Sequence, residues 1–337
     1  MTPRERFHAT MNFEPVDRLP LVEWAGWWTE TLDRWYGEGL PTDLTDRYDI
    51  VGHFGLEKYK QTWFRSVHRD VPPPEVHGAG LLTGEGTFED KYEKLHPSLF
   101  QIHDTWPIDP AVWSQWAAEQ EKGDSVLWFT VEGPFWFPRT LFGIEDHFYA
   151  YYDEPDLMHR MNRENTEWTL RIIDRLCEIC TPDFMTFAED MSYNNGPMLS
   201  EDLFNEFMLP YYERIVPVLK ERGIIPVVDS DGDITKAIPW FERAGIDAIL
   251  PLERQAGVDL QAIREAHPRF RCIGHFDKLV MHRGEEAIRG EFERLLPIAR
   301  QGGFIISCDH QTPPGVSLED YRLYLRLFAE YAEQVGS

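Results

Sequence analysis

Cysteine is scarce in this chain, and so are long apolar runs. Its 337 residues include only four cysteines, at positions 177, 180, 272 and 308, which is too few for a disulfide framework and predicts reduced thiols. No run of 18 apolar residues occurs, and the first twenty residues lack the apolar core of a secretory signal. We therefore expect a cytoplasmic protein without a membrane segment.

Positive charge is also in short supply. Lysine and arginine number 33 against 58 aspartates and glutamates, which gives a formal net charge of −25. That sign repels a phosphate backbone, so we expect no nucleic acid partner. Hydrophobic residues make up 42% of the chain and aromatic residues 14%, which is too apolar for a disordered acidic chain. The composition predicts a folded globular protein.

The second half of the chain alternates apolar segments with amphipathic ones. Five short apolar runs, each ending in polar or ionisable residues, span 183–190, 223–232, 247–253, 269–275 and 303–309. Helical spacing of apolar residues marks the segments between them, at 200–222, 233–244, 257–266 and 283–301. This alternation predicts parallel strands joined by helical crossovers.

Two more strands are predicted upstream, at 18–24 and 125–133, with one or two long helices at 153–180. An eighth strand could lie in 55–105, which looks more like an antiparallel hairpin. We predict a single α/β domain over residues 1–337, a (β/α)8 TIM barrel with an N-terminal insertion at roughly 50–120. A doubly wound open sheet is the rival fold. Its nucleotide-binding form has no support, because no G-x-G-x-x-G or G-x-x-x-x-G-K-[ST] follows a strand.

Ionisable residues follow almost every predicted strand, and barrel enzymes carry their working residues at these carboxyl ends. The residues at these ends are Glu23, Glu132, Glu189, Asp190, Asp229, Asp231, Glu253, His275, Cys308, Asp309 and His310. A combination of carboxylates and imidazoles suits Zn²⁺ or another divalent metal. We predict a metal site formed by Asp229, Asp231, Glu253, His275 and His310. The alternative is a hydrogen-bonded polar rim without metal, and Asp233 is better explained as a helix N-cap.

The cysteines contribute little to this site. Cys177 and Cys180 form a single C-x-x-C on a helical pattern, which favours helix packing. Cys308 lies two residues before His310 and is either a ligand or an inert buried thiol. The spacing does not decide between these two roles.

Tryptophan is concentrated in the first half of the chain. Core packing accounts for most of these residues. Trp24 and Trp27 directly follow the first predicted strand, however, and Trp136 follows Gly133-Pro134 after another. At the mouth of a barrel, such residues would form apolar walls around a small, flat substrate.

Several segments together resemble the uroporphyrinogen decarboxylase superfamily. The resemblance rests on residues 1–6, 13–20, 132–134, 141–143, 182–190, 274–278, 309–310 and 313–321. It covers nearly the whole chain and implies a (β/α)8 barrel. The superfamily includes porphyrinogen decarboxylases and corrinoid-dependent, zinc-containing methyltransferases.

The methyltransferase branch is the closer match. The decarboxylases bind substrate carboxylates through an arginine-rich segment after the first strand, whereas residues 23–30 here contain no arginine. A polycarboxylate would meet acids and indoles there, which disfavours it. On this reading the candidate substrate-binding residues are Glu23, Trp24, Trp27, Trp136 and Asn194, and the candidate catalytic residues are Glu189, Asp190 and Tyr193.

The metal motif of that branch consists of a His-x-Cys after one strand and a Cys near the last strand. In this sequence Asp229-x-Asp231 stands in the place of the His-x-Cys, and His310 in the place of the last Cys. Asp, Glu and His make a harder centre that prefers an oxygen ligand. The resemblance therefore implies methyl transfer from a methylated small molecule, with O-methyl favoured, to a corrinoid carried by a separate protein.

Two other functions remain open at this point. One is a decarboxylase or lyase of the same superfamily acting on a small acid, and the other is a non-catalytic barrel that binds ligands or assembles with partners. The sequence does not identify the methyl donor, and a homodimer is left open.

Overall fold

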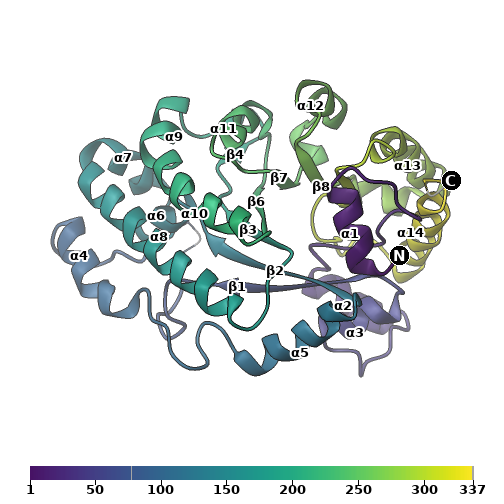
Figure 1. Cartoon of the computed structure of the whole chain (residues 1–337), viewed down its shortest axis with the longest axis horizontal. Coiled ribbons are helices and arrows are strands. Elements are labelled where there is room, and N and C mark those ends of the chain that lie inside the picture. Colours follow the sequence, from purple (N-terminus) through teal and green to yellow (C-terminus); the bar gives the residue numbers. More distant parts are fainter. Residues whose placement is uncertain (77, 336–337) are drawn as a thin grey trace.

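A curled, all-parallel sheet organises the structure, a computed structural model that describes residues 1–76 and 78–335. Its seven strands follow one another in chain order (Figure 1). They are β1 (Lys58–Phe64), β2 (Ser125–Glu132), β3 (Phe184–Ala188), β6 (Ile225–Ser230), β7 (Ala248–Pro251), β8 (Arg271–Phe276) and β9 (Phe304–Cys308). Every strand predicted from residue 125 onward is confirmed, and all neighbouring pairs are parallel.

The sheet curls as a TIM barrel does, but in the described residues no eighth strand closes it. The predicted strand at 18–24 is wrong, because this segment contacts both edges of the sheet without forming a ladder. The amide of Glu57 donates to the carbonyl of Leu21 at 2.7 Å, and the amide of Trp24 donates to Ser307 Oγ at 3.1 Å. Pro20 lacks an N–H for a ladder. The segment fills the eighth position without hydrogen bonding as a strand.

The antiparallel hairpin expected within 55–105 is also wrong. Residues 58–64 form β1, which pairs in parallel with β2 along its whole length. Residues 79–95, the expected second strand of this hairpin, instead contain helix α4 (Phe88–Leu95), capped by Thr87. The connection between β1 and β2 continues through helix α5 (Pro110–Glu121).

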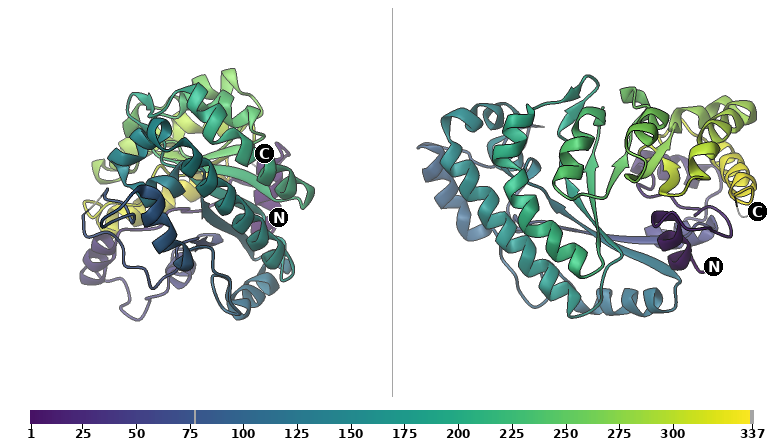
Figure 2. Two further views of the ribbon diagram at one scale, coloured as in Figure 1. Left: turned by 90° about the vertical axis from the view of Figure 1, so that its left-hand side faces the viewer. Right: turned by 45° about the horizontal axis from the view of Figure 1, so that its top comes forward.

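Helices cover the outer face of the sheet (Figure 2). The helices that accompany the sheet and are not yet named are α2 (Thr29–Gly37), α3 (Arg47–His53), α6 (Trp136–Phe142), α7 (Ile144–Asp153), α8 (Pro155–Cys177), α9 (Glu201–Phe207), α10 (Leu209–Glu221), α11 (Ile238–Arg243), α12 (Leu260–Ala266), α13 (Glu285–Ala299) and α14 (Leu318–Ala332). Helix α1 (Pro3–Met11) lies instead at the amino end of the sheet. The helix predicted at 200–222 is divided into α9 and α10 at Met208, just before Pro210 in the first turn of α10. A small hairpin of β4 (Ser192–Tyr193) and β5 (Gly196–Pro197) follows β3. Across residues 1–76 and 78–335, no helix has both the length and the apolar character to span a membrane.

The space inside the curled sheet is filled with side chains at its amino end. Alternate residues of the strands point inward, and Trp128 of β2 stacks on Phe184 of β3 with ring centroids 4.7 Å apart. Phe7 and Met11 of α1 join this inner cluster. Because α1 packs over the amino end, the interior of the sheet opens at the carboxyl ends of the strands.

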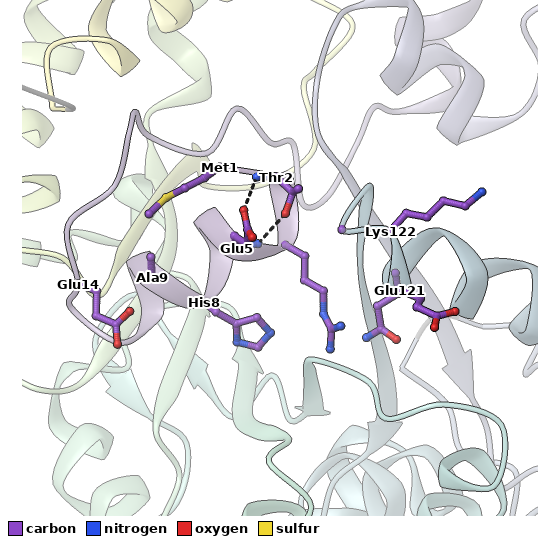
Figure 3. A pocket seen from close by; sticks show the side chains of 11 residues that line it. Met1, Thr2, Glu5, His8, Ala9, Glu14, Glu121 and Lys122 are labelled. Atoms are coloured by element: carbon purple, nitrogen blue, oxygen red, sulfur yellow. Dashed lines mark hydrogen bonds between the residues drawn. The ribbon is translucent and has the colours of Figure 1, made fainter.

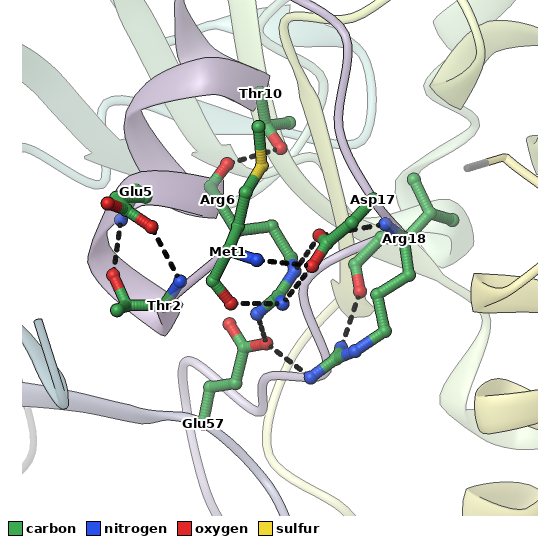
Figure 4. A network of polar contacts seen from close by, with 9 residues as sticks. Met1, Thr2, Glu5, Arg6, Thr10, Asp17, Arg18 and Glu57 are labelled. Atoms are coloured by element: carbon green, nitrogen blue, oxygen red, sulfur yellow. Dashed lines mark hydrogen bonds and ion pairs between the residues drawn. The ribbon is translucent and has the colours of Figure 1, made fainter.

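A buried ion-pair network attaches α1 to the sheet (Figure 4). Arg6, 4% exposed, donates to Glu57 Oε1 at 2.6 Å and to both carboxylate oxygens of Asp17. Arg18 also pairs with Glu57 Oε1, at 2.9 Å. Burial raises the pKa of Glu57, and the positive charges of Arg6 and Arg18 oppose that rise.

Arg6→Met is expected to lower the free energy of unfolding by about 2–3 kcal/mol. This is less than the ~3–5 kcal/mol lost when a buried charge is left without any partner, because Arg18 still neutralises Glu57. The measurement is urea unfolding followed by tryptophan fluorescence. The double variant Arg6→Met/Glu57→Gln should recover part of the loss, and a single variant as stable as the wild type would contradict the role given to this network.

The buried His147 on α7 is expected to make the protein less stable in acid. Its ring is fully buried against Phe135 and Tyr151, and neither ring nitrogen has a hydrogen-bond partner in the described part of the chain. Burial, followed by the positive charge of Arg139, lowers the pKa of His147 to about 3. An unfolded histidine takes up a proton near pH 6.5, so stability is lost as the pH falls from 6.5 toward 3.

Replacing His147 by leucine should remove this loss. Between pH 6.5 and 5 the wild type is expected to lose about 2 kcal/mol that the variant keeps, because each pH unit in this window corresponds to about 1.4 kcal/mol. The test compares the pH slopes of urea unfolding free energies, with the exposed His53→Leu as the matched control. Equal slopes for His147→Leu and the wild type would show that His147 takes up its proton in the folded state.

Candidate active site

A cavity of about 280 Å³ opens at the carboxyl ends of the strands. It is lined by Trp24, Ala25, Arg47, Gln61, Trp63, Trp136, Ala188, Asp190, Asp229, Asp231, His310 and Gln311. This is the end of the sheet that α1 leaves open, and it is where barrel enzymes place their chemistry. The lining therefore defines the candidate active site.

Asp229 and Asp231 reach the cavity from the end of β6. Val227 belongs to the inner cluster, so Asp229, two residues later on the same strand, also points inward. Burial, with the negative charges of Asp190 and Asp231, raises the pKa of Asp229 well above its usual range. Burial and the neighbouring carboxylates, Asp190 foremost, raise the pKa of Asp231 to about 7.

Asp190 supplies the third carboxylate from the turn after β3. Its backbone has a φ of 39°, and its Oδ1 accepts the amide of Asp231 at 3.2 Å. Burial is the main cause of its raised pKa. The negative charge of Asp190 thus raises the pKa of both Asp229 and Asp231, and a cation entering the cavity would favour their ionised forms.

His310 lies at the rim after β9. Its Nε2 is 3.8 Å from Asp231 Oδ2, and its ring lies edge-on to Trp24 and stacked on Trp28, with centroids 6.3 Å away in both cases. Burial, and then the charge of Lys278, lowers the pKa of His310. Trp24 is held in place by its indole N–H, which donates to the carbonyl of Cys308 at 2.8 Å. His310 therefore joins the aromatic rim to the carboxylates.

His275 and Glu253, the other two predicted metal ligands, do not line the cavity. The ring of His275 lies against the carbonyl of Leu252 through Nδ1, at 2.7 Å, and against Arg294 of α13 through Nε2, at 3.2 Å. It is turned toward the outer helix layer. Glu253 stays near the rim, where its Oε2 accepts the amide of Gly232 at 3.2 Å.

The predicted metal set therefore converges only in part. Asp229, Asp231 and His310 reach one cavity. Over residues 1–76 and 78–335, no group of three or more His, Cys, Asp or Glu side chains has an arrangement that could hold a metal ion. The donor types suit a divalent ion, but their arrangement in these residues does not fit one.

Glu189, predicted as catalytic, lies beneath the cavity wall. Its side chain is fully buried, and its Oε2 accepts the amides of Phe135 and Trp136 at 2.9 and 3.1 Å. Tyr212 donates its hydroxyl to the other oxygen. Burial raises the pKa of Glu189 to about 8. The residue fixes the start of α6, and with it Trp136.

The other predicted residues lie outside the cavity lining, apart from the tryptophans at 24 and 136. Glu23 is buried and accepts the hydroxyl of Tyr324 at 2.6 Å, and burial raises its pKa to about 7. Cys308 is a fully buried thiol beside Glu23. Trp27 packs in the core against Trp35, Phe54 and Tyr321. Tyr193 and Asn194 are exposed on the β4–β5 hairpin.

Sequence reasoning missed Arg47, Gln61 and Trp63, which also line the cavity. A signal existed for two of them. On a parallel strand, Tyr59, Gln61 and Trp63 share one face, and Tyr59 belongs to the inner cluster. Arg47 lies at the start of α3, where no local pattern marks it.

A second hollow lies at the opposite end of the sheet, between α1 and residues 120–123 (Figure 3). Arg4 and His8 from this hollow both contact Asp183 Oδ1 at 2.7 Å. Their polar groups hold α1 against the start of β3. Polar groups at the amino end of a barrel serve stability, so this hollow is not an active-site candidate.

Comparison with known proteins places the chain in a family. The model of the uroporphyrinogen decarboxylase (URO-D) family matches residues 115–331, and no curated protein matches the sequence. A methyltransferase from Methanosarcina mazei superposes with a TM-score of 0.64 at 15% identity, covering 98% of this chain and 99% of that one. A putative vitamin-B12-independent methionine synthase from Listeria monocytogenes gives 0.46 at 10% identity over 95% and 98% of the two chains. At 15% identity the likeness to the first protein shows the fold alone. The TM-score of the second is too low to support any argument. With more than half of its length matched by the family model, the chain belongs to the uroporphyrinogen decarboxylase family.

Proposed function

We propose that this protein is a methyltransferase that moves a methyl group from a small methylated molecule, bound in the cavity, to a corrinoid carried by a separate protein. Family membership supports an enzyme of this barrel family, and the full-length likeness in fold to the Methanosarcina mazei methyltransferase adds support for the methyltransferase branch. The observation that carries the proposal is the lining of the cavity, in which three tryptophans and three aspartates surround a small volume.

The same lining argues against a porphyrinogen substrate. A polycarboxylate would meet Asp190, Asp229 and Asp231, with only Arg47 as a positive group in the wall, and like charges brought together cost several kcal/mol. The cavity of about 280 Å³ is also at the lower limit of small-ligand pockets, which span roughly 300–1,000 Å³. A tetrapyrrole does not fit this space.

The residues of the chain would contribute mainly by positioning. Indole walls exclude water and hold the donor so that its methyl group faces the open mouth, where a corrinoid can approach. The reduced corrinoid is a second substrate, and its nucleophilic cobalt takes the methyl group. Three features remain predictions from the sequence: the O-methyl donor, the zinc ion and the homodimer. Metal analysis of the purified protein tests whether zinc is bound.

Methyl transfer to cob(I)alamin tests the function directly. The purified protein is incubated with cob(I)alamin and a panel of O-, N- and S-methyl compounds, and formation of methylcobalamin is followed by its absorption spectrum. We expect transfer from at least one donor and none without protein. Failure with every donor, together with release of CO₂ from a small acid, would instead establish the decarboxylase alternative. Failure of both reactions would favour a non-catalytic barrel.

A further inference from the structure

The cavity joins aromatic walls to an excess of negative charge. Trp24, Trp63 and Trp136 contribute indole rings, and Asp190, Asp229 and Asp231 contribute carboxylates. Trp24 is 9% exposed, whereas Trp63, at 41%, extends to the entrance. Aromatic faces attract cations through their quadrupole, and quaternary ammonium groups are recognised in this way.

Among the lining residues, Asp229 indicates which kind of ligand the cavity favours. It is 8% exposed, it borders the cavity, and its carboxylate has no hydrogen-bond or ion-pair partner within the part of the chain that the structure describes. A polar group with so little exposure needs a hydrogen-bond partner. The partner of Asp229 comes from the cavity, either as water or as a ligand that is positive or donates a hydrogen bond.

No positive side chain nearby contacts the Asp229 carboxylate in the described residues. Arg47 donates through Nη2 to the carbonyl of Trp24, and its Nε has no partner there. Arg139, with its guanidinium 4.5 Å from the Trp136 ring, donates to the carbonyl of Asp190 at 3.2 Å. Lys278 binds Asp309 at 3.0 Å and Gln255 at 2.8 Å. None of these contacts satisfies Asp229, so the lining keeps a net preference for a cation.

We propose that the methyl donor is a small quaternary ammonium ion, held by the indole walls and by Asp229 and Asp231. This inference rests on the proposed function and replaces the O-methyl donor that the sequence predicts. A quaternary ammonium group has no N–H to donate, so it suits a site that offers aromatic faces and charge.

Methyl transfer from such a donor needs neither an acid nor a metal in the site. In the transfer step the C–N bond breaks with its electron pair remaining on nitrogen, and the methyl carbon bonds to the electron pair of a cobalt(I) corrinoid. Cobalt is formally oxidised to cobalt(III), and the amine leaves neutral. An ether oxygen would leave as an anion and would need an acid, whereas a neutral amine needs none.

Binding of choline and its uncharged isostere, 3,3-dimethyl-1-butanol, tests the proposal by isothermal titration calorimetry on the full chain. The two compounds share a shape and differ in charge. Choline is expected to bind at least ~10-fold more tightly, which corresponds to about 1.4 kcal/mol. Asp229→Asn and Asp231→Asn should each remove most of this difference, while the exposed Asp202→Asn on α9 should not change it. Thermal unfolding checks that each variant is folded.

Equal binding of the two compounds, or unchanged choline binding in both cavity variants, would overturn the proposal. Failure of the inference is distinguishable from failure of the function. Choline binding without any methyl transfer to cob(I)alamin would refute the function and leave the ammonium site in place. Transfer from an O-methyl compound such as guaiacol, without charge-dependent choline binding, would support the function and refute the ammonium site.

Discussion

Gly274→Ala is expected to lower the free energy of unfolding by about 3–4 kcal/mol or more, enough to reduce the yield of folded protein. A Cβ at this position would lie 2.2 Å from the carbonyl oxygen of Pro251 on the neighbouring strand β7. Overpacking of this kind costs about 1–3 kcal/mol or more. The backbone φ of 112° adds a further cost of order 1–3 kcal/mol for a residue with a side chain.

Urea unfolding measures this effect, and Gly290→Ala provides the matched control. Gly290 lies within helix α13, and a Cβ there meets no atom within 4 Å. Alanine is the better helix former, so the control should be stable or gain up to about 1 kcal/mol. If Gly274→Ala unfolds at the same urea concentration as the wild type, the strands at this point are not packed as described.

The conformation at Gly274 also explains why His275 lies away from the cavity. Ile273 points inward on β8, so strict alternation would turn His275 inward too. The positive φ values of Gly274 and His275, 112° and 64°, break that alternation at the end of the strand. The ring moves outward to Arg294. A metal role for His275 follows from its place in the sequence and not from the direction of its side chain.

Local patterns predicted most of the sheet and part of the site. Strands buried on both faces have a distinctive apolar run, so β2 to β9 of the large sheet could be placed from residue types alone. The alternation of side chains between the two faces of β6 also places Asp229 in the interior. By contrast, β1 is a strand with polar and charged residues, and only its parallel pairing with β2 assigns it to the sheet. That pairing depends on distant residues that no local pattern contains.

The alternation of side chains along a strand also gives Glu189 and Asp190 different surroundings, although both directly follow the same predicted strand. Ala188 lines the cavity, so the next side chain points outward and the one after it inward. Asp190 accordingly reaches the cavity, and Glu189 reaches Tyr212 in the helix layer. Two neighbouring carboxylates after one strand thus have different surroundings and, we expect, different roles.

Glu189→Gln is expected to keep methyl transfer within about 3-fold of the wild type, since 3-fold is less than 1 kcal/mol, whereas Glu189→Leu and Gly133→Ala should lose most of it. Burial raises the pKa of Glu189 to about 8, so the side chain is a neutral acid at pH 7. Glutamine keeps the carbonyl acceptor for the two amides, and its NH2 group donates to the Tyr212 hydroxyl where the glutamate accepts from it. Leucine leaves the amides of Phe135 and Trp136 without their acceptor, at about 1–3 kcal/mol for each buried group.

Gly133→Ala acts on the same contact from the other side. A Cβ on Gly133 would lie 2.0 Å from Glu189 Oε1, and that oxygen is buried and held by Tyr212, so it has no room to move. Both disruptive variants should displace Trp136 and therefore weaken donor binding, which appears as a raised KM with unfolding free energies measured in parallel. A folded but inactive Glu189→Gln would show instead that the carboxyl group takes part in the chemistry. Retention of activity by glutamine and its loss with leucine would identify Glu189 as a positioning residue, acting through the indole that it holds.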